Sequence, residues 1–246
     1  MLDRVRNTAV ACALLVMGSI PAYAQEQSAF SASRTRETVK KYGECIVGRN
    51  AALSRGVILA DIHRQSLSQQ APKLFDPDCL IGLSMGPERY GVAFPGDTPL
   101  YAIAEALVRR DYATVGTWDF ASRPPLDHRK PELVLAAVNK RRAPVPEKPI
   151  DPAEIQASID AFHILAQWGE CVVRRDPTAV HTLLLAEPSS QDEQRAFEAL
   201  KEPFGLCLGD GEVALSRQNA RGTLAVNFYR LAGAPTGASV KTPKVN

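Results

Sequence analysis

Two stretches of this chain decide its fold: Tyr42-Gly43-Glu44-Cys45-Ile46-Val47-Gly48-Arg49-Asn50 and Trp168-Gly169-Glu170-Cys171-Val172-Val173-Arg174-Arg175-Asp176. Each begins with an aromatic residue, continues with Gly-Glu-Cys and ends with arginine followed by a short polar side chain. Further along, Cys79-Leu80 corresponds to Cys207-Leu208, so the two cysteine spacings are 34 and 36 residues. The shared order and spacing predict two diverged copies of one unit.

Apolar residues recur at helical spacing in both copies, which predicts an all-α fold with three to four helices in each unit. In the second copy, Asp151-Pro152 is typical of a helix start and Asp176-Pro177 of a helix end followed by a new helix. In the first copy, helices are expected near residues 34–48, 51–66 and 100–111. The only segments that resemble short extended pieces are 90–94 and 212–215.

The four cysteines outside the N-terminal segment are expected to form disulfides, because no C-x-x-C spacing suggests a zinc site. Four cysteines allow three pairings. Repeated structure implies repeated bonding, so the repeat favours one bridge inside each unit, Cys45–Cys79 and Cys171–Cys207. Each bridge closes a loop whose chain entropy is worth about 3–4 kcal/mol.

The N-terminal residues have the pattern of a cleavable signal peptide. Arg4 and Arg6 precede an apolar run, and Ala22-Tyr23-Ala24 offers small residues where a signal peptidase reads them. We therefore expect export to the periplasm or the extracellular space, with no transmembrane segment in the mature chain. An uncleaved N-terminal anchor is the alternative.

The predicted organisation has six parts, which differ in composition and periodicity. They are a signal peptide (1–24), a disordered N-terminus (25–33), the first helical repeat (34–112), a linker with a short helix and a proline-rich spacer (113–150), the second repeat (151–231) and a disordered tail (232–246).

One segment matches a catalytic pattern. Gly82-Leu83-Ser84-Met85-Gly86 has the G-x-S-x-G form of a nucleophile elbow, in which the serine stands on a turn between a strand and a helix. The chain lacks the alternating strands and helices that such a hydrolase sheet requires. Ser84 is therefore a weak catalytic candidate, and a glycine-rich loop is the favoured interpretation.

The other polar residues indicate structure more than chemistry. Glu170 precedes Arg174 by four residues, the spacing of a helical ion pair. The four histidines show no ligand spacing, so we expect no metal and no cofactor. The paired basic residues beginning at Arg109 are expected to face solvent. Gly43 and Gly169 lie inside predicted helices, where glycine is costly, and therefore indicate a close approach of two helices beside each cysteine.

The formal net charge of +2, spread over mixed signs, is not typical of a nucleic-acid-binding surface. No reactive constellation converges in the sequence, and a duplicated helical module is suited to presenting surfaces. The leading expectation is a non-catalytic module that binds an envelope or extracellular macromolecule. The alternatives are a serine hydrolase that uses Ser84 and a structural spacer.

Overall fold

The computed structural model describes residues 22–61, 71–81, 96–114, 116–128, 152–208 and 215–233 of the chain. These residues form helices joined by irregular segments and contain no strand, which confirms the predicted all-α class for the described part. Several predicted features lie outside the described residues: the segments 90–94 and 212–214, the short helix and proline-rich part of the linker after residue 128, and Ser84. The predicted signal peptide, of which only residues 22–24 are described, stays a prediction.

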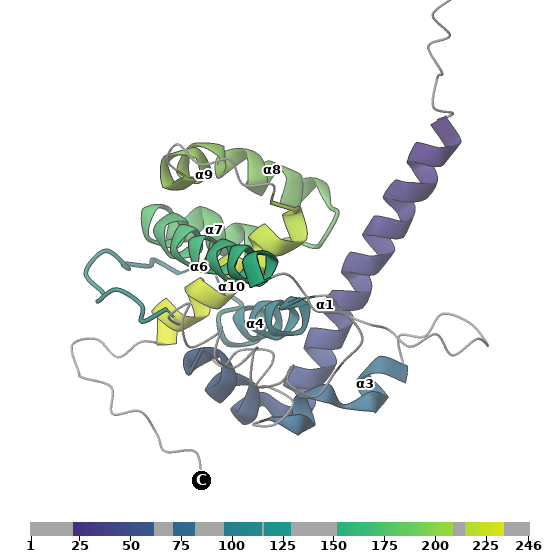
Figure 1. Ribbon diagram of the computed structural model, residues 1–246, viewed down its shortest axis with the longest axis horizontal. Coiled ribbons are helices and arrows are strands. Elements are labelled where there is room, and N and C mark those ends of the chain that lie inside the picture. The colour runs from purple at the N-terminus through teal and green to yellow at the C-terminus, as the bar shows by residue number, and fades with distance from the viewer. Residues whose placement is uncertain are drawn as a thin grey trace, which may run out of the picture.

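The first half contains one long bent helix, α1 (Ala22–Leu59), the short elements η1 (Pro72–Phe75) and α3 (Pro77–Ile81), and the helix α4 (Thr98–Asp111). Asn50 interrupts α1 with φ −135° and ψ 45°, close to the break expected between two helices. The segment 25–33, expected to be disordered, is instead part of α1. It contains good helix formers and no proline or glycine, so nothing stops the helix from extending back to Ala22. These first turns extend away from the packed helices (Figure 1).

The second half contains α6 (Pro152–Arg175), α7 (Pro177–Leu185), α8 (Gln191–Ala199), α9 (Lys201–Leu208) and α10 (Arg217–Gly233). Asp176 separates the first two and caps α7, because its carboxylate accepts a 2.8 Å hydrogen bond from the Ala179 amide. Ser190 caps α8 by accepting from the Glu193 amide at 3.1 Å. The cap at Asp176 falls at the helix boundary that the sequence predicts, and Ser190 with Glu193 three residues later has the sequence pattern of a helix start.

Both predicted disulfides are present. Cys45–Cys79 ties α1 to α3, and Cys171–Cys207 ties α6 to α9, with Cα–Cα distances of 5.7 and 5.8 Å. Each bridge holds a short, weakly buried helix against the long helix of its own half. This constraint matters because a helix as short as α3 buries little apolar surface of its own.

The two halves share one hydrophobic core. The helix α4 lies in the middle of the bundle, packed against α1 on one side and α10 on another (Figure 1). The described part of the predicted linker, residues 116–128, is irregular as expected, yet it adds Trp118 and the fully buried Phe120 to this core. Both rings contact Phe228 of α10 at centroid distances of 4.9 and 5.4 Å. No helix among the described residues is long and apolar enough to cross a membrane.

The two glycines beside the disulfides allow helices to approach closely, as the sequence predicts. A Cβ atom on Gly43 of α1 would lie 2.2 Å from the carbonyl oxygen of Ala102 in α4. A Cβ atom on Gly169 of α6 would lie 2.6 Å from both the Thr223 methyl group and the Asn227 amide nitrogen in α10. Alanine fits neither position unless the helices move apart.

We expect Gly43→Ala to lower the melting temperature by several degrees, because backbone atoms of α4 block the added methyl group. Overpacking of this kind costs about 1–3 kcal/mol, which corresponds to about 2–4 °C per kcal/mol in a chain of this size. Thermal unfolding followed by circular dichroism measures the change. Gly48→Ala on the same helix is the matched control, because nothing lies within 4 Å of its added Cβ. Equal melting temperatures for the two variants would contradict the close approach.

Candidate functional site

Few of the residues singled out by sequence analysis belong to a site in the structure. Ser84 lies outside the described residues, and the four cysteines are taken up in the two bridges. In the described ranges no group of three or more His, Cys, Asp or Glu side chains could hold a metal ion. The candidate site therefore comes from the cavities between helices.

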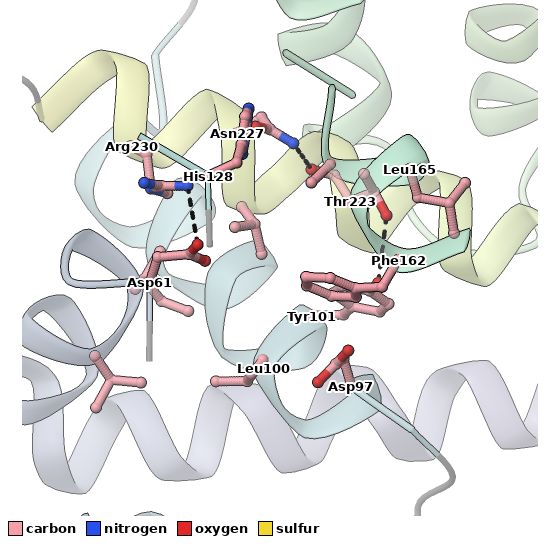
Figure 2. Close-up of a pocket in the computed structure, with 14 residues that line it drawn as sticks. Asp61, Asp97, Leu100, Tyr101, His128, Phe162, Leu165, Thr223, Asn227 and Arg230 are labelled. Atoms are coloured by element: carbon pink, nitrogen blue, oxygen red, sulfur yellow. Dashed lines mark hydrogen bonds and ion pairs between the residues drawn. The ribbon is translucent and has the colours of Figure 1, made fainter. Parts of the chain in front are cut away.

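One pocket lies where α1, α4, α6 and α10 meet (Figure 2). It contains about 490 Å³ of atom-free space, part of it open to solvent, and it is narrow, since only a small part of this space is wide enough for a water molecule. Most of the surface that faces the hollow is apolar. The apolar lining residues are Val57, Ile58, Leu100, Tyr101, Phe162, Leu165, Ala166 and Val226. A site of this shape suits a slim apolar molecule.

Charged groups line the pocket in two places: Asp61 and Arg230 face each other on one side, and Asp97 lies apart from them, near Tyr101 (Figure 2). The Arg230 guanidinium lies 3.5 Å from the Asp61 carboxylate and donates a 2.8 Å hydrogen bond to the Asp127 carbonyl oxygen. Asp61 follows the end of α1 with φ 49°, a left-handed conformation that aspartate tolerates better than most residues. Asp97 adds a second carboxylate.

Asn227, one of the lining residues, carries a buried hydrogen-bond acceptor that is not used. Its amide nitrogen donates to the Thr223 carbonyl oxygen at 2.9 Å, and the residue is 1% exposed. The nitrogen must face that carbonyl because two oxygens would repel each other, so the side-chain oxygen Oδ1 points the other way. Oδ1 has no partner in the described part of the chain. A buried acceptor left unpaired costs about 1–3 kcal/mol.

Behind the pocket, Glu170 fixes the described part of the linker to α6. Its carboxylate accepts a 3.0 Å hydrogen bond from the Leu126 amide, lies 2.6 Å from His128 Nε2, and accepts from Arg174 Nε at 2.8 Å. Arg174 in turn donates to the carbonyl oxygens of Arg123 and Pro124. The predicted Glu170–Arg174 ion pair is confirmed at 2.7 Å, and it does more than stabilise the end of a helix. Because His128 lines the pocket, this network also positions one of its walls.

The opposite side of the α4–α10 contact holds a buried ionic cluster. Arg221 of α10 is 1% exposed and donates to Glu105 of α4 at 2.6 Å and to Glu193 of α8 at 2.9 Å. It also donates to the carbonyl oxygens of Leu184 and Ala186 at the end of α7. Arg36 of α1 completes the cluster by bonding Glu193 at 2.8 Å. Burial alone would lower the pKa of Arg221, but the two carboxylates outweigh it and raise that pKa.

Sequence reasoning missed both the cluster and the pocket. Arg221, Glu105 and Glu193 are distant in the sequence and match no motif. Arg109, expected to face solvent, is mostly buried and donates to the carbonyl oxygens of Leu185 and Ala186 at 3.0 and 2.7 Å. Its aliphatic stem and guanidinium cover the end of α7, which a pair of basic residues in a sequence does not reveal.

Comparisons with protein-family models, with curated proteins and with solved structures each found no match to this chain. The proposed function therefore rests on the structure of the site.

The Glu170 network makes the stability of the protein sensitive to acid. Burial raises the pKa of Glu170, but the hydrogen bonds from His128, the Leu126 amide and Arg174 outweigh it and lower that pKa from 4.5 to about 2. A carboxylate whose pKa is lower in the folded chain stabilises the fold above the unfolded value, and this contribution is lost as the pH falls from about 4.5 to 2.

We expect Glu170→Gln to lower the free energy of unfolding at pH 6 by up to about 3 kcal/mol and to lower it much less at pH 2.5. Urea unfolding at both pH values measures the two differences. Glu44→Gln is the matched control, because Glu44 has the corresponding sequence position but a half-exposed side chain. If the cost of Glu170→Gln does not depend on pH, the network does not hold the carboxylate in its charged form.

Proposed function

We propose that this chain is an exported, non-catalytic binding module built from two diverged repeats, and that it holds a small apolar molecule in the pocket between α1, α4, α6 and α10. The pocket carries the proposal: it is narrow, mostly apolar and lined by both halves. The two disulfides fit an oxidising compartment and thus export.

Equivalent contacts in the two halves support the repeat. If Tyr42 is aligned with Trp168 and Ile103 with Leu224, then Gly43 and Ala102 correspond to Gly169 and Thr223, the two close helix approaches. The aromatic residues that begin the two stretches also act alike. Tyr42 donates to the carbonyl oxygen of Leu74 at 2.7 Å, and Trp168 donates to that of Phe204 at 3.4 Å, each shortly before the second cysteine of its half.

The seam between the halves supports it further. In the same alignment Tyr101 corresponds to Gly222, and these two residues touch, since a Cβ on Gly222 would lie 2.2 Å from the Tyr101 ring. Contact between equivalent residues is what a two-fold relation between two copies produces at its axis. The ion pair of Arg109 with Glu187 likewise corresponds to that of Arg230 with Asp61.

This relation places the pocket opposite the ionic cluster as its counterpart. Arg221 corresponds to Leu100, Glu105 to Val226 and Arg36 to Phe162. In one half-site the charged side chains of Arg36, Glu105 and Arg221 line a smaller hollow of about 300 Å³, whereas in the other apolar side chains line the hollow of about 490 Å³. A larger and more apolar hollow at one of two equivalent places is the feature expected of a ligand site added to a structural module.

Two other functions, binding of a macromolecule and a structural spacer, have less support from the structure. The exposed large apolar side chains of the described part, Leu59, Ile164 and Leu206, lie on three different helices, so they give less support to a macromolecular partner than the pocket gives to a small one. A structural spacer has no need of an apolar hollow.

We expect the purified protein to bind 1-octanol, used as a slim apolar probe, and Ala166→Phe to abolish this binding by filling the pocket. Isothermal titration calorimetry measures the binding. Ile164→Phe is the matched control, because Ile164 lies two residues away on α6 with 49% of its surface exposed. Ala166→Leu serves if the phenylalanine variant does not fold, with a smaller loss expected. No binding to the original protein, or equal binding by all variants, would refute the pocket as the site.

The serine hydrolase alternative has its own test. A fluorophosphonate probe labels only serines that a neighbouring base activates. We expect no labelling of the purified protein beyond that of Ser84→Ala. Labelling that disappears in this variant would replace the binding proposal with an enzymatic one.

A further inference from the structure

Building on the repeat relation in the proposed function, we infer that a groove between α1 and α4 binds a non-helical acidic segment of a partner protein. The residues that line this α1–α4 groove are Glu44, Val47, Gly48, Ala106, Arg109 and Arg110, and none of them lines the apolar pocket. The groove contains about 710 Å³ of atom-free space, part of it open to solvent, and far more of it than of the pocket is wide enough for a water molecule.

The equivalent place in the second half is occupied by an irregular stretch of the chain itself. In the alignment of the two halves, Glu44, Gly48 and Arg109 correspond to three residues that hold the segment 120–128 by its backbone. These are Glu170, which accepts from the Leu126 amide, Arg174, which donates to the carbonyl oxygens of Arg123 and Pro124, and Arg230, which donates to that of Asp127. The α1–α4 groove is thus the counterpart of a surface that binds a polypeptide.

Among the described residues, no such segment covers the groove in the first half. The side chain of Glu44 is 46% exposed, whereas that of Glu170, which the segment covers, is 11% exposed. Gly48 leaves open the space that the Arg174 side chain takes in the other half, since no described atom lies within 4 Å of a Cβ built on it. A surface suited to holding a segment by its backbone is therefore open to a segment from another chain.

Arg110 sets the charge of that segment. It is exposed, and its Nη1 donates a 3.0 Å hydrogen bond to the Val47 carbonyl oxygen, which holds the guanidinium at the groove. Its Nε and Nη2 have no hydrogen-bond partner in the described part of the chain, and this edge of a guanidinium binds a carboxylate through two parallel hydrogen bonds. The neighbouring carboxylate of Asp111 is already bonded by Arg55 and the Tyr229 hydroxyl.

Charge complementarity favours a partner protein over this chain's own tail. The lining contains two arginines and one acidic residue, Glu44, whose carboxylate lies 3.6 Å from the Lys40 ammonium. Residues 234–246 follow α10 as residues 113–125 follow α4, but they contain two lysines and no acidic residue. The two arginines attract an acidic segment and repel a basic one.

The test uses a capped heptapeptide with the sequence of residues 120–126 in which the arginine is replaced by glutamate. Its counterpart has glutamine at that position. Isothermal titration calorimetry on the purified protein should show binding of the acidic peptide and about tenfold weaker binding of the glutamine peptide. Arg110→Gln should make the two peptides bind alike. Arg195→Gln makes the same change of charge at a side chain of α8 that is 71% exposed, and it should keep the tenfold ratio.

A second pair of variants tests the place of binding. Gly48→Trp fills the groove from an open position on α1 and should abolish binding of the acidic peptide. Gly56→Trp is the matched control, because Gly56 lies on the same helix and nothing lies within 4 Å of its added Cβ either. No binding of the acidic peptide to the original protein, equal binding of the two peptides, or unchanged binding by Gly48→Trp overturns the inference.

Two further outcomes would assign the groove to another occupant and overturn the partner. Peptide binding that appears only after residues 234–246 are removed would assign it to the tail. A dimer that the acidic peptide dissociates, seen by analytical ultracentrifugation, would assign it to a second copy of the chain. Binding of 1-octanol is measured on the same samples, so a failure of peptide binding alone leaves the small-ligand function intact.

Discussion

The contact between α4 and α10 is the constraint on which the rest of the structure depends. Tyr101 lies so close to Gly222 that any side chain at the glycine would enter the ring. Each of these helices also has a second close neighbour that contributes a glycine: Gly43 of α1 packs against α4, and Gly169 of α6 packs against α10. Four helices are therefore held at short distances through three glycine positions, and the shared core forms around them. The disulfides then add the short helices α3 and α9 to a frame that already exists.

The two spaces beside the contact of α4 with α10 differ in the side chains that line them, which are ionic on one side and apolar on the other. Around Arg221, two carboxylates and two carbonyl oxygens satisfy a guanidinium that would be costly to bury alone. Such a cluster adds little net stability compared with apolar packing, but it tolerates only one arrangement of α1, α4, α8 and α10. On the other side, apolar packing is incomplete and leaves the pocket. The ionic side fixes the geometry, and the open side is free to accept a ligand.

Sequence reasoning succeeded where the signal was local or repeated. The helix caps at Asp176 and Ser190, the break near Asn50 and the two disulfide pairings follow from short patterns and from their recurrence. The buried Arg221 cluster contains bonded residues up to 157 positions apart, and no local pattern marks such a set. The pocket is harder still to predict from the sequence, because it is a space that the surrounding side chains do not fill. One signal existed in the proposed repeat: aligning Ile103 with Leu224 sets Leu100 against Arg221 and Val226 against Glu105, an apolar residue against a charged one in each case.

The same rigidity that frames the pocket explains why binding there is physically reasonable. Its walls come from α1, α4, α6 and α10, which the glycine contacts hold together before any ligand arrives. A preformed site spares the ligand the entropy cost of ordering the protein, so even a small apolar contact area yields useful affinity. Because both halves line the pocket, a ligand that fills it also strengthens their docking, and its binding free energy adds to the stability of the whole bundle. In the proposed function, ligand binding and folding are therefore coupled through one contact, that between α4 and α10.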